Sequence, residues 1–305
     1  MNTQYFKYAV EIERTRSITQ AAENLYMGQP NLSRAVKELE ETLGFAIFER
    51  TTKGVVPTEK GTEFLTYAKN VLVQLDNMER LAGMATGELQ TLSVAVPRAS
   101  YISKALAEFV SEMDFERPID INIKETNAMQ SITDVTEQRH DFAIIRYRMQ
   151  NESYFNDYLN EKKLKYEVLW EFERIILTSE KNMYIKSDMI KREDLSKCIE
   201  LMHGDTLVPY HRQNKKTSSS DKAKNIRLYE RANQFELLSR ISEAYIWTSP
   251  VPKSHLERYG LVMVHSDRPG RTYRDVIIYP SGYTFSDIDK RFINKVYAAK
   301  NELAL

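Results

Sequence analysis

Cysteine, glycine and long apolar runs are scarce in this chain of 305 residues. Its single cysteine, Cys198, excludes an intramolecular disulfide and indicates a reducing compartment. Only 10 residues are glycine, about 3% where roughly 7% is usual, so glycine-rich phosphate loops are not expected. Because no apolar run approaches ~18 residues, no membrane span is predicted. The N-terminus has no basic stretch before an apolar run, so we expect a cytoplasmic protein without a secretory signal.

An excess of charge of either sign is also absent, since 43 Lys and Arg balance 43 Asp and Glu. This balance excludes a polycation that binds nucleic acid through bulk charge, and it excludes an acidic tail. Residues 1–90 carry ten Lys and Arg against twelve Asp and Glu, a net charge of −2. A nucleic-acid function would therefore depend on where the cations lie. The length predicts about two domains.

The chain changes character near residue 90. Residues 1–85 show helical periodicity, whereas β-rich runs alternate with helical segments from residue 91 onward. Gly83 and Gly87 break the helical pattern between the two parts. Alternating strands and helices predict an α/β fold with a mainly parallel sheet covered on both faces. The predicted strands are residues 92–96, 119–124, 142–145, 168–177, 225–229, 244–247, 261–264 and 276–279.

Three short helices are predicted at the N-terminus, over residues 3–13, 17–25 and 29–43. Ser17 and Gln20 match a capping box, and Pro30 lies in the first turn of the third helix. The second and third helices flank a tight connection at residues 26–28, which is typical of a helix-turn-helix. The alternative is a helical hairpin with a solvated polar face.

The third helix carries polar groups that suit a major groove. Gln29, Ser33 and Arg34 lie near its start, and glutamine suits adenine whereas arginine suits guanine. Residues 48–58 then predict a two-stranded wing with Arg50 and Lys53 near its tip, which would contact phosphates. An exposed hairpin without such a role is the alternative.

A long helix is predicted over residues 58–85, with Thr58 as its N-cap. Its apolar residues recur at alternating spacings of four and three, a heptad seam that predicts pairing with a second copy. The alternative is a long helix packed on its own domain. The seam consists of Phe64, Ala68, Val71, Leu75, Met78, Ala82 and Ala85.

Together these segments resemble the LysR-type transcriptional regulators. The matching stretches are SITQAAENL at 17–25, QPNLSRAVKELE at 29–40, LG at 43–44, FER at 48–50 and TEKG at 58–61. Gly28 and Pro57 depart from the pattern, which usually has Ser or Thr and Leu there. The helix-turn-helix and wing residues that we expect at DNA are Ser17, Thr19, Gln29, Pro30, Ser33, Arg34, Lys37, Arg50 and Lys53.

The resemblance also implies a domain plan. It places a winged helix-turn-helix at 1–58, a dimerisation helix and hinge at 59–90, and an effector domain at 91–305. The effector domain would have two α/β subdomains around a cleft, as in periplasmic binding proteins: subdomain I at 91–165 and 267–305, and subdomain II at 166–266. In this family such chains form dimers and tetramers. Trp247 stands in a segment, residues 244–250, where small residues are usual, so it bears on the size of the cleft.

Candidate effector contacts lie after predicted strands, where α/β sheets bind ligands. Arg146 is suited to a carboxylate, with a structural ion pair as its alternative. A core or surface imidazole is the alternative for His203. Residues 211–231 carry a net charge of +5 and attract anions or form a solvated loop. The candidates are Ser100, Tyr101, Asn127, Arg146, His203 and Thr248.

Enzyme motifs are lacking: the sequence contains no nucleophile elbow, P-loop or dinucleotide fingerprint. The five histidines show no metal-ligand spacing, so no metal and no cofactor are expected. Our leading hypothesis is a regulator that binds double-stranded DNA as an oligomer and responds to a small effector. The alternatives are an architectural DNA-binding protein without a ligand, and a solute-binding or enzymatic α/β domain with a helical appendage.

Overall fold

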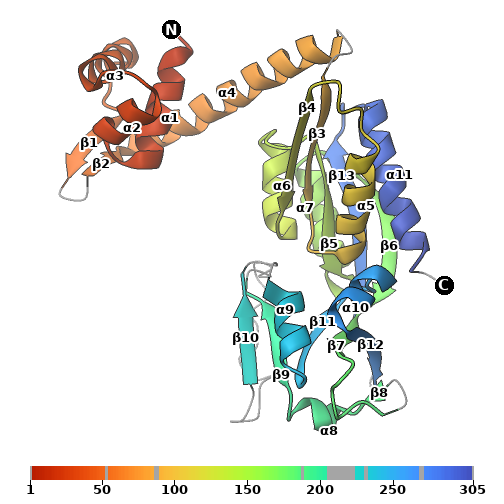
Figure 1. The fold of residues 1–305 in the computed structure, drawn as a ribbon. Helices are drawn as coiled ribbons and strands as arrows, with labels where there is room; N and C mark the ends of the chain where they lie inside the picture. Colours follow the sequence, from red (N-terminus) through yellow and green to blue (C-terminus); the bar gives the residue numbers. More distant parts are fainter. Residues whose placement is uncertain are drawn as a thin grey trace. The chain divides into compact units, whose positions relative to one another are not determined.

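The computed structural model shows two compact units, one up to Leu89 and one from Gln90 onward, which we describe separately (Figure 1). Most of the basic segment at 211–231 lies outside the described residues. The structure describes residues 2–51, 54–85, 89–186, 189–204, 224–229, 233–267 and 271–303.

The first unit is a helical domain with a two-stranded wing. Its core forms where α1, α3 and α4 bury apolar stripes, including Phe6, Leu39 and Leu65. The Oγ1 of Thr58 accepts a hydrogen bond from the Gly61 N–H at 2.9 Å, which confirms the predicted cap of α4. The elements are α1 (Gln4–Thr15), α2 (Ile18–Asn24), α3 (Gln29–Leu43), β1 (Phe48–Thr51), β2 (Gly54–Pro57) and α4 (Glu59–Ala85).

The start of α2 confirms only half of the predicted capping box. The Oγ of Ser17 accepts from the Gln20 N–H at 3.3 Å. The amide of Gln20 does not reach back, because its Nε2 donates to Glu23 and Asn24 further along the helix. Ser17 therefore caps α2 alone.

The wing is tied to the connection between α1 and α2. The Val55 N–H donates to the carbonyl oxygen of Arg16 at 3.0 Å. Gly54 has φ +103°, and a Cβ there would lie 2.7 Å from the same oxygen. Only glycine fits this position without strain. Gly54 therefore allows the wing to pack this closely against Arg16, the C-cap of α1.

The second unit begins with a five-stranded sheet of order β4-β3-β5-β13-β6. Helices α5 and α11 cover one face around Tyr101, Phe109 and Phe292, and α6 and α7 cover the other around Ile132 and Phe155 (Figure 1). The elements are β3 (Gln90–Val96), α5 (Ser100–Ser111), β4 (Ile119–Glu125), α6 (Ala128–Thr136), β5 (Phe142–Arg148), η1 (Met149–Asn151), α7 (Glu152–Glu161), β6 (Leu164–Glu173), β13 (Thr272–Pro280) and α11 (Asp287–Asn301).

A second sheet of order β10-β9-β11-β7-β12-β8 follows. One face packs on α9 and α10 through Phe235 and Leu256, and the other packs around Leu195 and the buried Cys198. The elements are β7 (Ile175–Ser179), β8 (Met189–Ile190), α8 (Arg192–Leu195), β9 (Ile199–His203), β10 (Lys224–Leu228), α9 (Asn233–Arg240), β11 (Ala244–Thr248), α10 (Lys253–Tyr259) and β12 (Leu261–Ser266).

The predicted α/β fold is confirmed, with corrections in detail. The run 168–177 is not one strand, because β6 ends at Glu173 in the first sheet and β7 begins at Ile175 in the second. The chain thus leaves the first sheet later than the expected position near Tyr166. Both sheets are mixed: β13 pairs antiparallel with β5 and β6, and β7 pairs antiparallel with β11 and β12. Strand β9 was not predicted.

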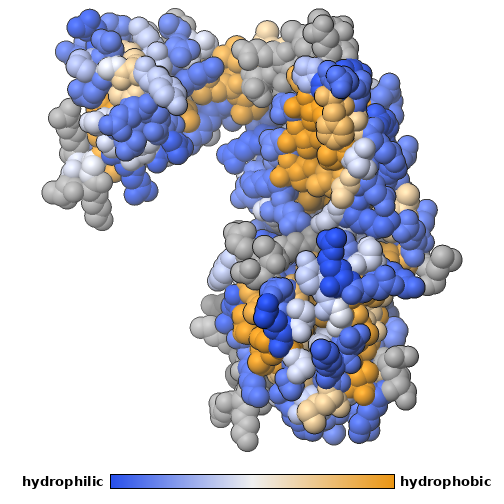
Figure 2. All heavy atoms as spheres, viewed as in Figure 1, coloured by the Kyte–Doolittle hydropathy of each residue, from blue (hydrophilic) through white to orange (hydrophobic). Residues whose placement is uncertain are grey.

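The surface of the second unit includes an apolar area on its first sheet. Figure 2 shows hydrophobic residues gathered where β4 and α5 lie in Figure 1. Partly buried apolar residues of these elements include Ile121, Ile123 and Val110. No helix in the described part of the chain is long and apolar enough to cross a membrane.

Candidate DNA interface and effector site

Helix α3 presents two chemically different faces. Leu32, Ala35, Val36 and Leu39 are buried against the rest of the unit. Gln29, Pro30, Arg34 and Lys37 are exposed, and Ser33 is half-buried. The predicted recognition residues therefore share the solvent side of one helix, which is the arrangement that a major groove requires.

Arg34 is the cation on this face that has no protein partner among the described residues. Lys37, by contrast, lies 3.8 Å from Glu41, and both of these side chains are largely exposed. An exposed guanidinium without a partner keeps its donors available for a base edge or a phosphate. Arg34 is thus the residue of α3 best placed to read a base.

The departure at Gly28 has a structural effect. Gly28 is the N-cap of α3, and the helix start has no side-chain cap hydrogen bond. Tyr26, two residues earlier, has φ +52° and is 98% exposed at the turn between α2 and α3. Thr19 is exposed on α2.

The wing residues are described only in part. Arg50 lies in β1, where its backbone pairs with Val55, while Lys53 is outside the described residues. Their predicted contacts with DNA therefore stay a prediction.

The predicted heptad seam divides into two parts. Phe64 packs edge-to-face on Phe6 with ring centroids 5.6 Å apart, and Ala68 is buried in the same core. These two residues hold α4 on its own domain, which was the alternative interpretation. Further along, Leu75 is half-buried, Val71 is 38% exposed and Met78 is 64% exposed. Among the seam residues whose side chains the structure describes, Val71, Leu75 and Met78 are the ones open to a second copy.

Arg146 has a carboxylate partner within the protein. Its Nε and Nη2 donate to Oδ1 and Oδ2 of Asp275, each at 2.7 Å. The hydroxyl of Tyr101 donates to Oδ2 of the same carboxylate at 2.6 Å. Asp275 and Tyr101 are fully buried. The structural ion pair is therefore the interpretation of Arg146 that the contacts favour, since both carboxylate oxygens already face its guanidinium.

The electrostatics of Arg146, Asp275 and Tyr101 also favour a structural role for this cluster. Burial raises the pKa of Tyr101 well above its usual value, and the charge of Asp275 raises it further. Burial alone lowers the pKa of Arg146, but the carboxylate of Asp275 outweighs that effect and raises it. The tyrosine therefore stays protonated and the guanidinium stays charged. Neither group is poised for proton transfer.

The same arginine connects the two sheets. Its Nη1 donates to the Arg98 carbonyl at 3.3 Å and to the Ser249 hydroxyl at 3.4 Å, and Ser249 follows β11. Arg98 in turn donates through Nη2 to the carbonyl of Tyr229, after β10, at 3.0 Å. Loops of the two subdomains are thus in direct contact. Asp275, Ser249 and Tyr229 were not predicted as site residues; the one available signal was an aspartate directly before the predicted strand at 276–279.

The other candidate residues lie at strand and helix ends, as expected. Ser100 is buried in the first turn of α5, and Asn127 caps α6 by accepting from the Gln130 N–H at 3.0 Å. His203 ends β9 and Thr248 ends β11, both half-buried.

Trp247 is half-buried near the end of β11. It packs with Tyr245 against the core that contains Cys198, on the sheet face opposite α9 and α10.

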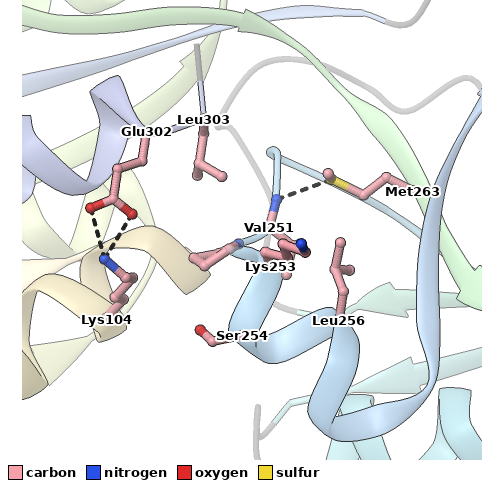
Figure 3. Close-up of a pocket in the computed structure, with 9 residues that line it drawn as sticks. Lys104, Val251, Lys253, Ser254, Leu256, Met263, Glu302 and Leu303 are labelled. Atoms are coloured by element: carbon pink, nitrogen blue, oxygen red, sulfur yellow. Dashed lines mark hydrogen bonds and ion pairs between the residues drawn. The ribbon is translucent and has the colours of Figure 1, made fainter. Parts of the chain in front are cut away.

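A cavity of about 510 Å³ lies between α5, α10 and the end of α11 (Figure 3). Its apolar lining includes Val251, Leu256 and Met263. On its polar side, Nζ of Lys104 lies 2.9 Å from Oε2 of Glu302. None of the six predicted effector residues lines this cavity. The described residues contain no group of three or more His, Cys, Asp or Glu that could hold a metal ion.

Comparison with known proteins identifies the N-terminal unit. Residues 3–62 match the family described as "Bacterial regulatory helix-turn-helix protein, lysR family". The HTH-type transcriptional regulator BudR of Klebsiella aerogenes is 31% identical over 135 residues, which cover 44% of this chain and 94% of BudR. The probable cat1 operon transcriptional activator of Acinetobacter lwoffii is 27% identical over 54% of each chain, so this chain spans about half of that relative.

The fold of the whole chain has solved counterparts. Full-length CbnR complexed with its target DNA matches with a TM-score of 0.62 at 15% identity, over 98% of this chain and 100% of CbnR. At this identity the likeness shows the fold alone. The relatives that match in sequence are transcriptional regulators rather than enzymes. The chain belongs to the LysR family of bacterial helix-turn-helix transcriptional regulators.

Proposed function

We propose that this regulator reads a dyad DNA site with the exposed face of α3. The observation that supports this most strongly is the partner-free, exposed guanidinium of Arg34 beside the polar Gln29 and Ser33. In the proposed complex Arg34 reads a base, while Lys37 and the wing cations Arg50 and Lys53 contact phosphates. In this proposal Ser17, the N-cap of α2, and Thr19 in its first turn contact the DNA backbone. Because the unit has no net positive charge, specificity depends on these contacts and on dimerisation.

Pairing of two copies through α4 would supply the dyad. The helix has 27 residues and is therefore about 40 Å long. Exposed Val71 and Met78, with half-buried Leu75, provide the apolar surface for the pair. Ala82 continues this spacing. The family resemblance further implies a tetramer built from two dimers.

We further propose that a small molecule bound by the second unit changes how the oligomer engages DNA, in the cytoplasm where the DNA is. Such a ligand must bind one arrangement of the subdomains better than another. The cross-sheet contacts from Arg146 to Ser249 and from Arg98 to Tyr229 are the contacts that such a rearrangement would alter. Ser100, Asn127, His203 and Thr248 remain candidate contacts at strand and helix ends.

The test is a titration of the full chain against promoter DNA from its neighbouring operon, with a scrambled duplex of equal length. We expect preference for the promoter and a steep loss of affinity between about 50 and 200 mM salt. Equal affinity for the two duplexes would contradict sequence-specific reading.

A ligand-independent regulator is the second candidate. It is favoured by one observation: Arg146, the residue best suited to a carboxylate, already has Asp275 as its partner. A thermal-shift screen of small carboxylates separates the two candidates. The ligand-independent regulator predicts no change in melting temperature with any of them.

A further inference from the structure

Two neighbouring cross-strand rows lie at one end of the first sheet, on strands β5, β13 and β6. In the first row Asp275 is paired in register with Arg146 on one side and Trp170 on the other. In the second row Tyr273 is paired with Arg148 and Phe172. The rows are two residues apart along β5 and β13, so their side chains share one face. They differ in one respect: a carboxylate occupies the centre of the first row, and a neutral phenol occupies the centre of the second.

A second arginine joins the phenol row. Arg148 donates through Nε to the Tyr273 hydroxyl oxygen at 2.8 Å. Arg174, which follows β6, approaches the same oxygen through Nη1 at 3.5 Å. Both guanidinium carbons lie over the Tyr273 ring, at 5.9 and 5.2 Å from its centroid. Two cations therefore converge on one small polar group.

The N–H groups of Arg148 and Arg174 share a single acceptor, the hydroxyl oxygen of Tyr273. Among the described residues, neither Arg148 nor Arg174 has a carboxylate oxygen within 4 Å. Each guanidinium uses one N–H on the tyrosine oxygen, and its other donors have no protein acceptor in the described part of the chain. The Tyr273 hydroxyl proton likewise has no acceptor among these residues. Part-buried cations left in this way are costly unless an anion binds them.

The electrostatic response of the site agrees with this geometry. Burial has the largest effect on Arg174 and lowers its pKa; Tyr273 opposes this effect, and the charges of Arg146 and Arg148 lower the pKa further. Burial raises the pKa of Tyr273, but the charges of Arg174 and Arg148 outweigh it and hold that pKa below its usual value. The surroundings of the phenol are thus strongly positive.

The carboxylate of Glu200 on β9 does not neutralise the cations. It acts on Arg174 only at a distance beyond 4 Å, and it accepts a hydrogen bond from the Tyr245 hydroxyl at 3.3 Å. Burial raises the pKa of Glu200, and its hydrogen bond with Tyr245 and the charge of Arg174 oppose that rise. The positive charge of Arg148 and Arg174 is therefore unmatched near the phenol.

We propose that Arg148, Arg174 and Tyr273 form a binding site for a small dianionic oxyanion, either a dicarboxylate or a phosphate. The bound anion does for Arg148 and Arg174 what Asp275 does for Arg146, and the Tyr273 hydroxyl donates to it. Planar guanidinium groups recognise carboxylate and phosphate oxygens through paired hydrogen bonds. The bound anion would be the small-molecule effector of the proposed function, so its regulatory role rests on that proposed function. Binding of the anion can be measured without DNA.

The test measures anion binding to the full chain without DNA. Inorganic phosphate and succinate are titrated separately in a chloride buffer of matched ionic strength, with calorimetry and thermal melting as readouts. We expect one of the two to raise the melting temperature above the chloride value, and the one that does identifies the source of the oxyanion. Arg148→Gln is expected to weaken this binding about 10- to 100-fold, and Tyr273→Phe to weaken it less.

Arg258→Gln is the matched control, because Arg258 is exposed on α10 and loses the same charge. It should bind the anion like the wild type. In chloride alone Arg148→Gln should melt no lower than the wild type, since it removes an uncompensated cation. If neither anion raises the melting temperature, or if Arg148→Gln responds as the wild type does, the proposal is wrong. Gel shifts with the same proteins test the proposed DNA recognition separately from the anion site. A protein that binds the anion but no DNA would contradict the proposed DNA recognition and leave the anion site standing.

Discussion

Arg146 and Asp275 form a two-point ion pair in which both carboxylate oxygens accept at 2.7 Å, and the fully buried Tyr101 donates to one of them. Asp275→Asn should therefore lower the free energy of unfolding of the second unit by about 3–5 kcal/mol, because it leaves a buried guanidinium without a counter-charge. Urea unfolding measures this loss. Asp120→Asn on the exposed side of β4 is the control and should change it by less than about 0.5 kcal/mol. Equal effects of the two substitutions would exclude a structural role for the pair.

Replacement of Arg34 tests the recognition face. Arg34→Ala should weaken binding to the promoter site by about 1–3 kcal/mol and relax the preference at one base pair. Fluorescence anisotropy with a set of single-base variants measures both effects. Lys7→Ala, which removes an exposed cation of α1, should have a smaller effect and leave the base preference unchanged. A uniform loss over all sequences would show that Arg34 contacts a phosphate.

The exposed part of α4 can be tested without harming the core. Met78→Glu combined with Val71→Glu should convert dimers to monomers, because both side chains are exposed and two carboxylates would face each other across a seam. Light scattering gives the mass, and circular dichroism reports whether the helices persist. Thr66→Glu places the same charge on the outer side of α4 and should leave the mass unchanged. An unaltered mass in the double variant would show that α4 does not pair.

The wing's tether can be tested at Gly54. Gly54→Ala should destabilise the first unit by about 1–3 kcal/mol, because it combines a positive φ with a Cβ 2.7 Å from the Arg16 oxygen. Gly28→Ala is the control, since a Cβ there meets its nearest atom at 3.7 Å in ordinary contact. Thermal unfolding of the two variants should differ accordingly. Similar melting temperatures would mean that the wing is free of α1.

The pH dependence of the first unit should carry a contribution from Glu11. Hydrogen bonds from Arg14 and Asn24 lower its pKa from 4.5 to about 2. Because the folded pKa is below the unfolded one, this contribution is complete above pH 4.5 and is lost as the pH falls toward 2. The stability difference between wild type and Glu11→Gln should therefore shrink over that interval. It should stay below about 1 kcal/mol, because the pair is near solvent. Glu63→Gln, which removes a carboxylate at an exposed position of α4, is the control.

Local signals predicted the first unit well because caps, proline and apolar spacing act within a few residues. The Thr58 cap is confirmed, and the polar residues of α3 lie on its exposed face. The heptad seam was harder, since spacing alone cannot say whether an apolar residue faces its own domain or a second copy. Phe64 faces its own domain, whereas Met78 does not.

Long-range arrangements limited the prediction of the second unit. No Gly, Pro, Asn or Asp interrupts residues 168–177, so the change of sheet between β6 and β7 gave no turn signal in the sequence. The partner of Arg146 is 129 residues away on β13, and nothing near Arg146 in the sequence identifies it. The antiparallel placement of β13 is set by the fold of the whole unit.

That single-residue passage between the sheets has a mechanical consequence. With only Arg174 between β6 and β7, any rotation of one sheet against the other along this strand must be taken up by very few backbone torsions. The same residue sends its guanidinium to the Tyr273 hydroxyl. An anion bound to this guanidinium would restrain the backbone torsions that the rotation needs. Arg174 would then both bind the anion and supply the hinge between the two sheets.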